Sequence, residues 1–321
     1  MNKINTKALV EASILIAIAS IIIIMSIYVP FFMIVGYILW PIPITLLTFK
    51  YDIKMSLMSL FALFLIVSAF ANPISAFSLI LLYGIPAVIL GICLRRKTSP
   101  FITVLSMAAS MFISYIVTIK LSTLIFGIDV MKETYKMFDD GISGAREMLR
   151  GMQISEEQIN VMIPKELNSS LLRMVLPGML AVTSILGSFL NYYVVGIIFK
   201  RLKIKIDTLK PFNEWYVSNS LSYGLFFSML VSFILVYLKV NNADIVFNSI
   251  YIIFQFAFII DGFAVVYWFL RSRRIGKILS IFIMVMLLSL SMVIFYLGII
   301  DFILDFRKIN PSRKRRIYPG E

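Results

Sequence analysis

Apolar residues come in nine long runs separated by short polar joints, and this pattern dominates the chain. The runs cover residues 8–28, 31–49, 55–71, 75–94, 101–126, 171–199, 220–238, 245–270 and 278–303. A helix needs ~20 apolar residues to cross the ~30 Å hydrocarbon layer of a membrane, and each run approaches or exceeds that length. The pattern predicts an all-α, polytopic integral membrane protein with eight or nine transmembrane helices.

Polar residues concentrate in one longer stretch, residues 127–170. Apolar positions recur at helical spacing from Met131 to Ala145, which predicts an amphipathic helix on the membrane surface. Ser155 followed by Gln158 fits a capping box that opens a second, short helix. Counting crossings from a cytoplasmic start places this insertion outside, in agreement with its excess of acidic over basic residues.

Prolines interrupt several of the apolar runs. Pro41 and Pro43 lie in the second run, Pro86 in the fourth and Pro177 in the sixth. Each removes a backbone donor, so kinks or unwound turns are expected there. Transporters place binding sites at such discontinuous helices, although proline is also frequent in membrane helices generally.

The composition argues against most enzyme chemistry. The 321-residue chain has no histidine and a single cysteine, Cys93, so the usual general base, a disulfide and a cysteine metal cluster are all excluded. Neither a P-loop nor a Gly-x-Ser-x-Gly nucleophile motif occurs. We therefore expect no catalytic residue, no metal site and no cofactor, and the chain is not predicted to be an enzyme.

The formal charge of +13 is explained by the membrane. Lysine and arginine gather in short clusters beside the apolar runs, at residues 50–54, 95–97, 200–205 and 271–277. Cytoplasmic joints of membrane proteins carry this excess, and anionic lipid headgroups attract it. The expected partners are thus membrane lipids and not nucleic acid. The expected location is the cytoplasmic membrane of a bacterium, with the N-terminus in the cytoplasm.

One conflict remains in this charge pattern. Nine crossings from a cytoplasmic start leave the C-terminus outside, yet the tail, residues 306–321, carries six lysines and arginines. Such a tail favours the cytoplasm. Either one apolar run is re-entrant, or the joint at residues 271–274 faces outward against its charge.

A few polar residues inside the apolar runs are candidates for lining a ligand cavity. Asp261 lies about midway along the run 245–270, and Gln255 precedes it on a different helical face. A carboxylate at mid-depth costs ~2.5–3.5 kcal/mol on insertion scales, so it needs a proton, a basic partner or water. Asn191 and Tyr192 could line the same cavity. The alternative for all four is hydrogen bonding between helices, and Asp261 has no evident acidic partner.

Two resemblances extend this reading. Residues 1–205 resemble the substrate-binding S-components of energy-coupling-factor transporters, through a small-residue first helix, a proline-interrupted second helix and a six-helix layout. The whole chain more closely resembles the YybS-like family (domain of unknown function 2232), through ALVEA at 8–12, DG at 261–262, LGIID at 297–301 and DFRK at 305–308.

The resemblance to S-components implies a partner and a division of the chain. It implies that Ala8 and Ala12, small residues on one side of the first helix, dock onto a coupling subunit; ordinary packing within the chain is the alternative. The implied domains are a six-helix region over 1–205 that includes the insertion, a three-helix region over 206–305 and the basic tail.

The leading hypothesis is a small-molecule-binding or permease-like subunit of a transport system. Without an ATP site of its own, it would draw energy from a coupling subunit and an ATPase, or from an ion gradient. The alternative is a membrane scaffold or regulator that recruits other proteins through its basic cytoplasmic joints.

Overall fold

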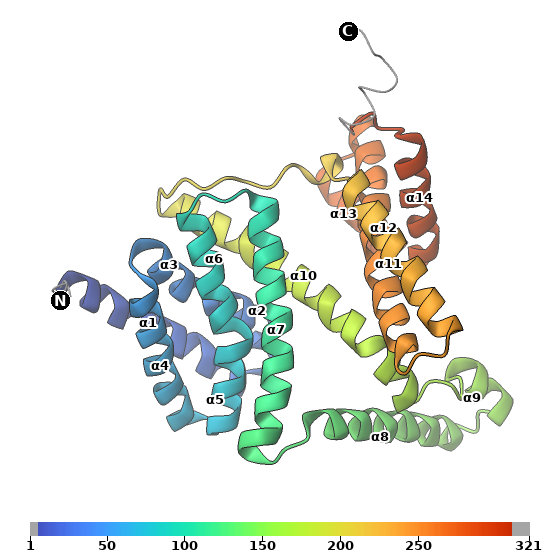
Figure 1. Ribbon diagram of the computed structural model, residues 1–321, viewed down its shortest axis with the longest axis horizontal. Helices are drawn as coiled ribbons and strands as arrows, with labels where there is room; N and C mark the ends of the chain where they lie inside the picture. The colour runs from blue at the N-terminus through green and yellow to red at the C-terminus, as the bar shows by residue number, and fades with distance from the viewer. Residues whose placement is uncertain (1–5, 310–321) are drawn as a thin grey trace, which may run out of the picture. The chain divides into compact units, whose positions relative to one another are not determined.

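A computed structural model of the chain describes residues 6–309, which are helical for most of their length and contain no strand (Figure 1). Within these residues, nine helical segments are long and apolar enough to cross a membrane. They coincide with the nine apolar runs, so the prediction of an all-α, multi-pass membrane protein is confirmed. The segments are Thr6–Tyr28, Pro30–Lys50, Ile53–Phe70, Pro73–Arg95, Pro100–Phe126, Ser169–Arg201, Asn219–Tyr237, Ala243–Ser272 and Lys277–Leu304.

The described residues form two compact units. Unit 1 comprises residues 6–164 and Thr183–Leu209, and unit 2 comprises Lys165–Val182 and residues 210–309. The predicted division at 205/206 lies close to the second boundary, but the start of the sixth long helix groups with unit 2. Residues 310–321, which include most of the basic tail, lie outside the described part of the chain, as do residues 1–5.

Unit 1 contains ten numbered α-helices or parts of them. Its elements are α1 (Thr6–Tyr28), η1 (Pro30–Phe32), α2 (Met33–Leu39), α3 (Pro41–Lys50), α4 (Ile53–Phe70), α5 (Pro73–Leu79), η2 (Ile80–Gly84), α6 (Ile85–Arg95), α7 (Pro100–Phe126), α8 (Val130–Gly151), α9 (Glu156–Met162) and most of α10 (Ser169–Arg201).

The core of unit 1 lies around α3 and α4. Trp40, Ile44, Leu47 and Leu63 are fully buried and pack in one apolar cluster with residues of α1 and α6. Asn72 caps α5 by accepting a hydrogen bond from the Ser75 amide at 2.7 Å, which fixes the joint between α4 and α5.

The prolines have smaller effects on the backbone than the sequence suggests. The second run begins in the 3₁₀ turn η1 and is then interrupted at Trp40, whose backbone remains in the right-handed helical region. Ahead of Pro86, residues Ile80–Gly84 form a single π-helical turn. Pro177 lies inside the continuous helix α10. The α-helix is therefore interrupted just before Pro41 and ahead of Pro86, but not at Pro177.

The polar insertion is helical as predicted. Helix α8 has no buried residue, and its Arg146 guanidinium donates to the side chain of Asn160 at 3.1 Å in α9. Ser155 caps α9, where its hydroxyl accepts a hydrogen bond from the Gln158 amide at 3.4 Å. The predicted helix and the predicted cap are both confirmed, and the position of α8 on the membrane surface stays a prediction.

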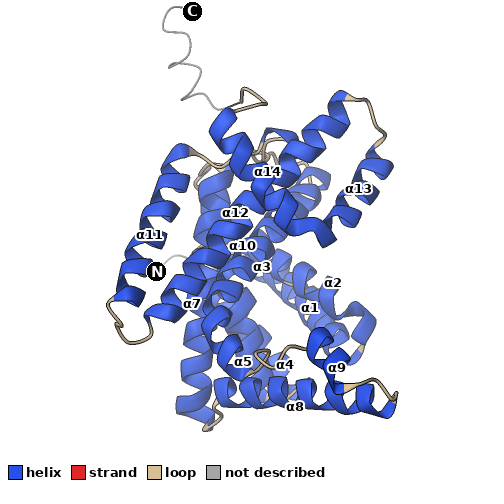
Figure 2. Ribbon diagram, turned by 90° about the vertical axis from the view of Figure 1, so that its right-hand side faces the viewer, coloured by secondary structure: helices blue, strands red, loops and turns tan. Residues whose placement is uncertain are grey.

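Unit 2 is a bundle of long helices around an aromatic core. After η3 (Phe212–Glu214) follow α11 (Asn219–Tyr237), α12 (Ala243–Ser272), α13 (Lys277–Met286), η4 (Leu287–Leu290) and α14 (Ser291–Leu304). Phe258 is 2% exposed and packs its ring against those of Phe254, Phe295 and Phe302. This cluster holds α12 and α14 together. The last apolar run forms two separate helices, α13 and α14, as Figure 2 shows.

Candidate functional site

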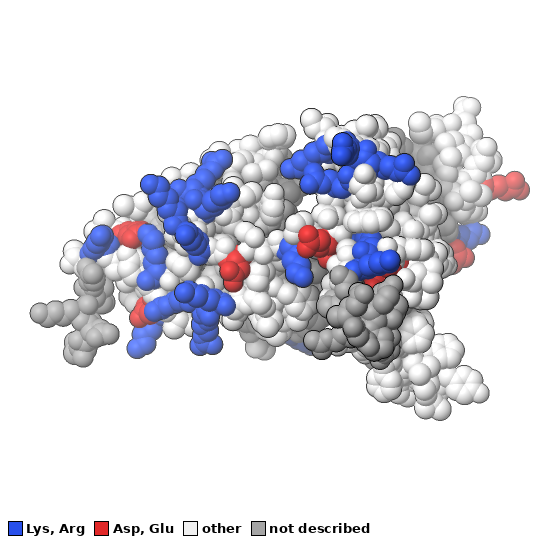
Figure 3. Space-filling view, turned by 90° about the horizontal axis from the view of Figure 1, so that it is seen from above, with Lys and Arg blue, Asp and Glu red and all other residues white. Residues whose placement is uncertain are grey.

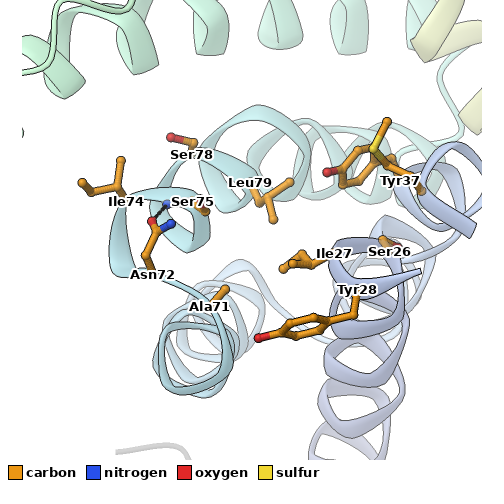
Figure 4. Close-up of a pocket in the computed structure, with 11 residues that line it drawn as sticks. Ser26, Ile27, Tyr28, Tyr37, Ala71, Asn72, Ile74, Ser75, Ser78 and Leu79 are labelled. Atoms are coloured by element: carbon orange, nitrogen blue, oxygen red, sulfur yellow. Dashed lines mark hydrogen bonds between the residues drawn. The ribbon is translucent and has the colours of Figure 1, made fainter. Parts of the chain in front are cut away.

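A cavity of about 560 Å³ lies at one end of unit 1, where α1 ends and α5 begins (Figure 4). This volume is within the range of ~300–1,000 Å³ that is usual for small-molecule sites. Eleven residues line the cavity: Ser26, Ile27, Tyr28, Met33, Tyr37, Ala71, Asn72, Ile74, Ser75, Ser78 and Leu79.

The lining combines apolar side chains with neutral polar groups. Hydroxyl groups come from three serines and two tyrosines, the amide from Asn72, and none of the eleven residues carries a charge. The Tyr28 hydroxyl donates to the carbonyl oxygen of Phe70, which ties the end of α1 to the end of α4. Behind the lining, Tyr37 stacks on Tyr83 with ring centroids 5.5 Å apart. Such a lining suits a neutral molecule with an apolar body and a few polar groups.

The opposite end of α1 is basic and polar. Near its start, Glu11 pairs with Lys50 and accepts a hydrogen bond from the Tyr51 hydroxyl at 2.6 Å. That bond raises the pKa of Tyr51, because ionisation of the hydroxyl would lose it. Arg95 donates to the carbonyl oxygen of Tyr51 at the same end. The 17 residues from Glu11 to Tyr28 correspond to ~25 Å of helix, so the cavity and this basic end lie at opposite ends of unit 1.

Unit 2 holds a buried cluster of three charged side chains, Asp261 of α12, Asp301 of α14 and Arg307. The guanidinium of Arg307 donates to Asp301 Oδ2 from Nε at 3.0 Å and from Nη2 at 2.8 Å, and it also pairs with Asp261 Oδ1. Its Nη1 donates to the carbonyl oxygens of Asn213, at 3.2 Å, and Trp215, at 2.7 Å. All five N–H groups of the guanidinium are therefore used.

Burial makes this charge cluster expensive to break. The side chain of Arg307 is 0% exposed, and those of Asp261 and Asp301 are 1% and 5% exposed. Asp261 Oδ2 accepts a further hydrogen bond from the Val217 amide at 3.3 Å. Asp301 Oδ1, in contrast, is buried and accepts no hydrogen bond from the described residues. Both oxygens of Asp261 are thus engaged, but only one oxygen of Asp301.

The backbone positions the cluster through close helix contact and a sharp helix end. A Cβ atom at Gly298 would lie 2.0 Å from the carbonyl oxygen of Phe258, so α14 approaches α12 closely because this residue is glycine. Asp305 ends α14 in the left-handed conformation, with φ of 48°, and its amide donates to the Asp301 carbonyl oxygen at 2.7 Å. This turn directs Arg307 back toward the helices.

The four predicted cavity residues divide between the units, two in each. Asp261 lies in the charge cluster, where it accepts a hydrogen bond from the amide of Val217, just ahead of α11. Gln255 contacts the sulfur of Met292 at 3.6 Å. In unit 1, Asn191 donates to the Gly187 carbonyl oxygen at 3.0 Å and Tyr192 to that of Asp207 at 2.6 Å. None of the four lines the cavity of Figure 4.

Ala8 and Ala12 lie on the buried side of α1. They are 5% and 4% exposed, and Ala12 belongs to the apolar core cluster of unit 1. This arrangement is the packing alternative that the sequence left open. The exposed side of α1 instead carries Leu9, Val10, Ile14, Ile18 and Ile21.

Sequence reasoning missed the partner of Asp261 and the cavity. Arg307 was counted with the basic tail, but it is buried, and Asp301 supplies the acidic partner that Asp261 was thought to lack. A signal existed, because an acidic residue near the end of an apolar run followed closely by arginine can form a local pair. Of the residues that line the cavity, only Asn72, in the Asn72–Pro73 turn, stood out in the sequence.

Replacing each aspartate with asparagine should show that the two carboxylates contribute differently to stability. In Asp261→Asn, the new NH₂ group faces either the Val217 amide or the Arg307 guanidinium, which are both donors. We therefore expect a loss of ~1–3 kcal/mol in the free energy of unfolding. Asp301→Asn keeps the oxygen that Arg307 uses and places its NH₂ where nothing donates, so a smaller loss is expected. Unfolding in detergent micelles measures both. Equal losses would contradict the assignment of one idle oxygen to Asp301.

Comparison with known proteins agrees with this architecture. Residues 17–302 match the family described as "Predicted membrane protein (DUF2232)". The chain belongs to this family. It is also similar to the protein named "Uncharacterized protein YybS" of Bacillus subtilis (strain 168), with 23% identity over 290 residues that cover 85% of this chain and 87% of the relative. No solved structure matches the chain significantly.

Proposed function

We propose that this membrane protein is the small-molecule-binding subunit of a transport system and that it holds its ligand in the cavity of unit 1. The observation that carries the proposal is the cavity itself, of about 560 Å³, with an uncharged lining of hydroxyl, amide and apolar groups. A ligand of this site is a neutral small molecule with both apolar and hydrogen-bonding parts.

The placement of the cavity supports capture from outside the cell. Basic residues gather at the other end of unit 1, where Lys50, Arg95, Arg96 and Lys97 are exposed (Figure 3). Positive joints favour the cytoplasm, so the cavity would open toward the outer side of the cytoplasmic membrane. The Phe77 ring of α5 contacts Phe126, at the end of α7, with centroids 5.9 Å apart, so α8 begins at the cavity end of unit 1.

The energy for transport would come from other subunits or from an ion gradient. The sequence contains no P-loop, and the six-helix region resembles S-components, which work with a coupling subunit and an ATPase. Ala8 and Ala12 are covered within unit 1 and would not form the docking surface in this conformation.

Native mass spectrometry of the purified protein tests the proposal. The wild-type protein should carry a copurified small molecule, and Ser78→Trp, which fills the cavity, should lose it. Leu65→Trp is the matched control, because this side chain is 54% exposed on the outside of α4 and does not line the cavity. Absence of any bound molecule from the wild type, or the same molecule on Ser78→Trp, would overturn the proposal.

A scaffold or regulatory role is the second candidate. Its support is the set of exposed basic side chains at the joints 95–97 and 271–274, which could recruit acidic partners. Copurification with proteins unrelated to transport, together with an empty cavity, would favour this role.

A further inference from the structure

Helices α11 and α12 define the two ends of unit 2. Helices α11 and α12 are antiparallel, because Phe233 packs against Phe247 and Phe226 against Phe254, with ring centroids 6.2 and 6.3 Å apart. The joint between α12 and α13, residues 273–276, therefore lies at the same end of unit 2 as the start of α11. The turn between α11 and α12 lies at the other end (Figure 1).

The end of α14 also lies beside the start of α11. Arg307 follows α14 by three residues, and its guanidinium donates to the carbonyl oxygens of Asn213 and Trp215, at 3.2 and 2.7 Å. Both carbonyls precede the N-cap of α11, Ser218. The segment Lys277–Leu304 thus begins and ends at one end of unit 2.

Contacts between α12 and α14 give the same result independently. Gln255 meets Met292, Phe258 meets Phe295, and a Cβ atom at Gly298 would lie 2.9 Å from the amide nitrogen of Gly262. The residue numbers rise together, so α14 runs in the same direction as α12. A helix that crossed straight back after α12 would run in the opposite direction.

The break between α13 and α14 has the features of a turn inside a membrane. Helix α13 has 10 residues and α14 has 14, which give ~15 Å and ~21 Å, each short of the ~30 Å hydrocarbon layer. The turn between them, η4, is a 3₁₀ helix whose Ser289 hydroxyl donates to the Met286 carbonyl oxygen at 2.9 Å. Backbone groups at a break in lipid need such partners.

We infer that the segment Lys277–Leu304 is a re-entrant helical hairpin that enters and leaves the membrane on the same side. The chain then crosses the membrane eight times. The conflict in the charge pattern is removed, because the basic tail lies on the side of the basic joint 271–277. The buried charge cluster closes the hairpin by holding Arg307, after α14, to α12 and to the segment before α11.

Cysteine accessibility tests this topology in the full-length protein with Cys93→Ser as background. Three variants carry the single cysteine: Arg273→Cys, Asn241→Cys and Ser312→Cys, of which Ser312 lies beyond the described residues. A membrane-impermeant maleimide is added to intact cells and to inverted membrane vesicles. We expect Ser312→Cys to be labelled from the same side as Arg273→Cys and Asn241→Cys from the opposite side.

Denatured samples provide the control for each variant. For each variant, the labelling in cells or vesicles is divided by the labelling of the same variant denatured in SDS, so poor expression does not alter the result. Labelling of Ser312→Cys from the side of Asn241→Cys would show that the segment crosses the membrane and would overturn the inference. This outcome is independent of whether the cavity of unit 1 binds a ligand.

Discussion

Replacing Arg307 with alanine is expected to lower the free energy of unfolding of unit 2 by ~3–5 kcal/mol, the usual cost of removing one partner from a buried ion pair. The substitution leaves Asp261 and Asp301 buried without a counter-charge, and it removes donors from the carbonyl oxygens of Asn213 and Trp215. Unfolding of the purified protein in detergent micelles, followed by circular dichroism, measures the change.

Two neighbouring substitutions give this experiment its controls. Lys308→Ala removes an exposed positive charge next in sequence and should change stability by less than ~0.5 kcal/mol. Arg307→Lys keeps the charge but offers three donors where five are used, so its effect should lie between the two. If Arg307→Ala behaves like Lys308→Ala, the cluster does not stabilise the fold.

Replacing Gly298 with alanine is expected to destabilise the contact between α12 and α14 by ~1–3 kcal/mol, the usual cost of overpacking a core. The added Cβ would lie 2.0 Å from the Phe258 carbonyl oxygen and 2.9 Å from the Gly262 amide nitrogen. Backbone atoms cannot rotate away as a side chain can, so one helix has to move. The same unfolding measurement reports the loss.

Gly224 of α11 provides a matched control in the same unit. A Cβ atom there meets nothing within 4 Å, so alanine adds helix propensity without a clash. Gly224→Ala should therefore leave stability unchanged or raise it slightly. Equal behaviour of the two alanine variants would contradict the close helix approach at Gly298.

The cluster and the glycine contact act on the same element. The glycines allow α14 to lie against α12, and Arg307 then fixes the end of α14 to the segment before α11. Loss of either should loosen the hairpin Lys277–Leu304. Because they share this element, we expect the double variant Arg307→Ala with Gly298→Ala to deviate from the sum of the single effects.

Local patterns were sufficient to predict the helices. The apolar runs gave all nine segments, Ser155 with Gln158 gave the cap of α9, and the spacing from Met131 to Ala145 gave α8. These features depend on residues a few positions apart. The break at 287–290 was not foreseen, since the sequence there, Leu-Leu-Ser-Leu, has the composition of an ordinary transmembrane helix.

The candidate sites were far less predictable. Asp261 was singled out correctly as an unusual buried charge, but its partner Arg307 lies 46 positions away in a stretch that reads as a basic tail. The cavity of unit 1 is lined by serines, tyrosines and an asparagine from α1, α2 and α5, each common in membrane helices. Only their convergence at one end of unit 1 distinguishes them.

The sequence by itself determined that this is an integral membrane protein, because the length and polarity of each apolar run decide whether lipid or water solvates the helix. Its charges also left two alternatives for the topology: one apolar run is re-entrant, or the joint at residues 271–274 faces outward against its charge. The tertiary structure decided between them, since the direction of α14 depends on its contacts with α12 and on the hydrogen bond of Arg307 to the segment before α11, which are distant in sequence. For the same reason, it alone showed that Arg307 is buried.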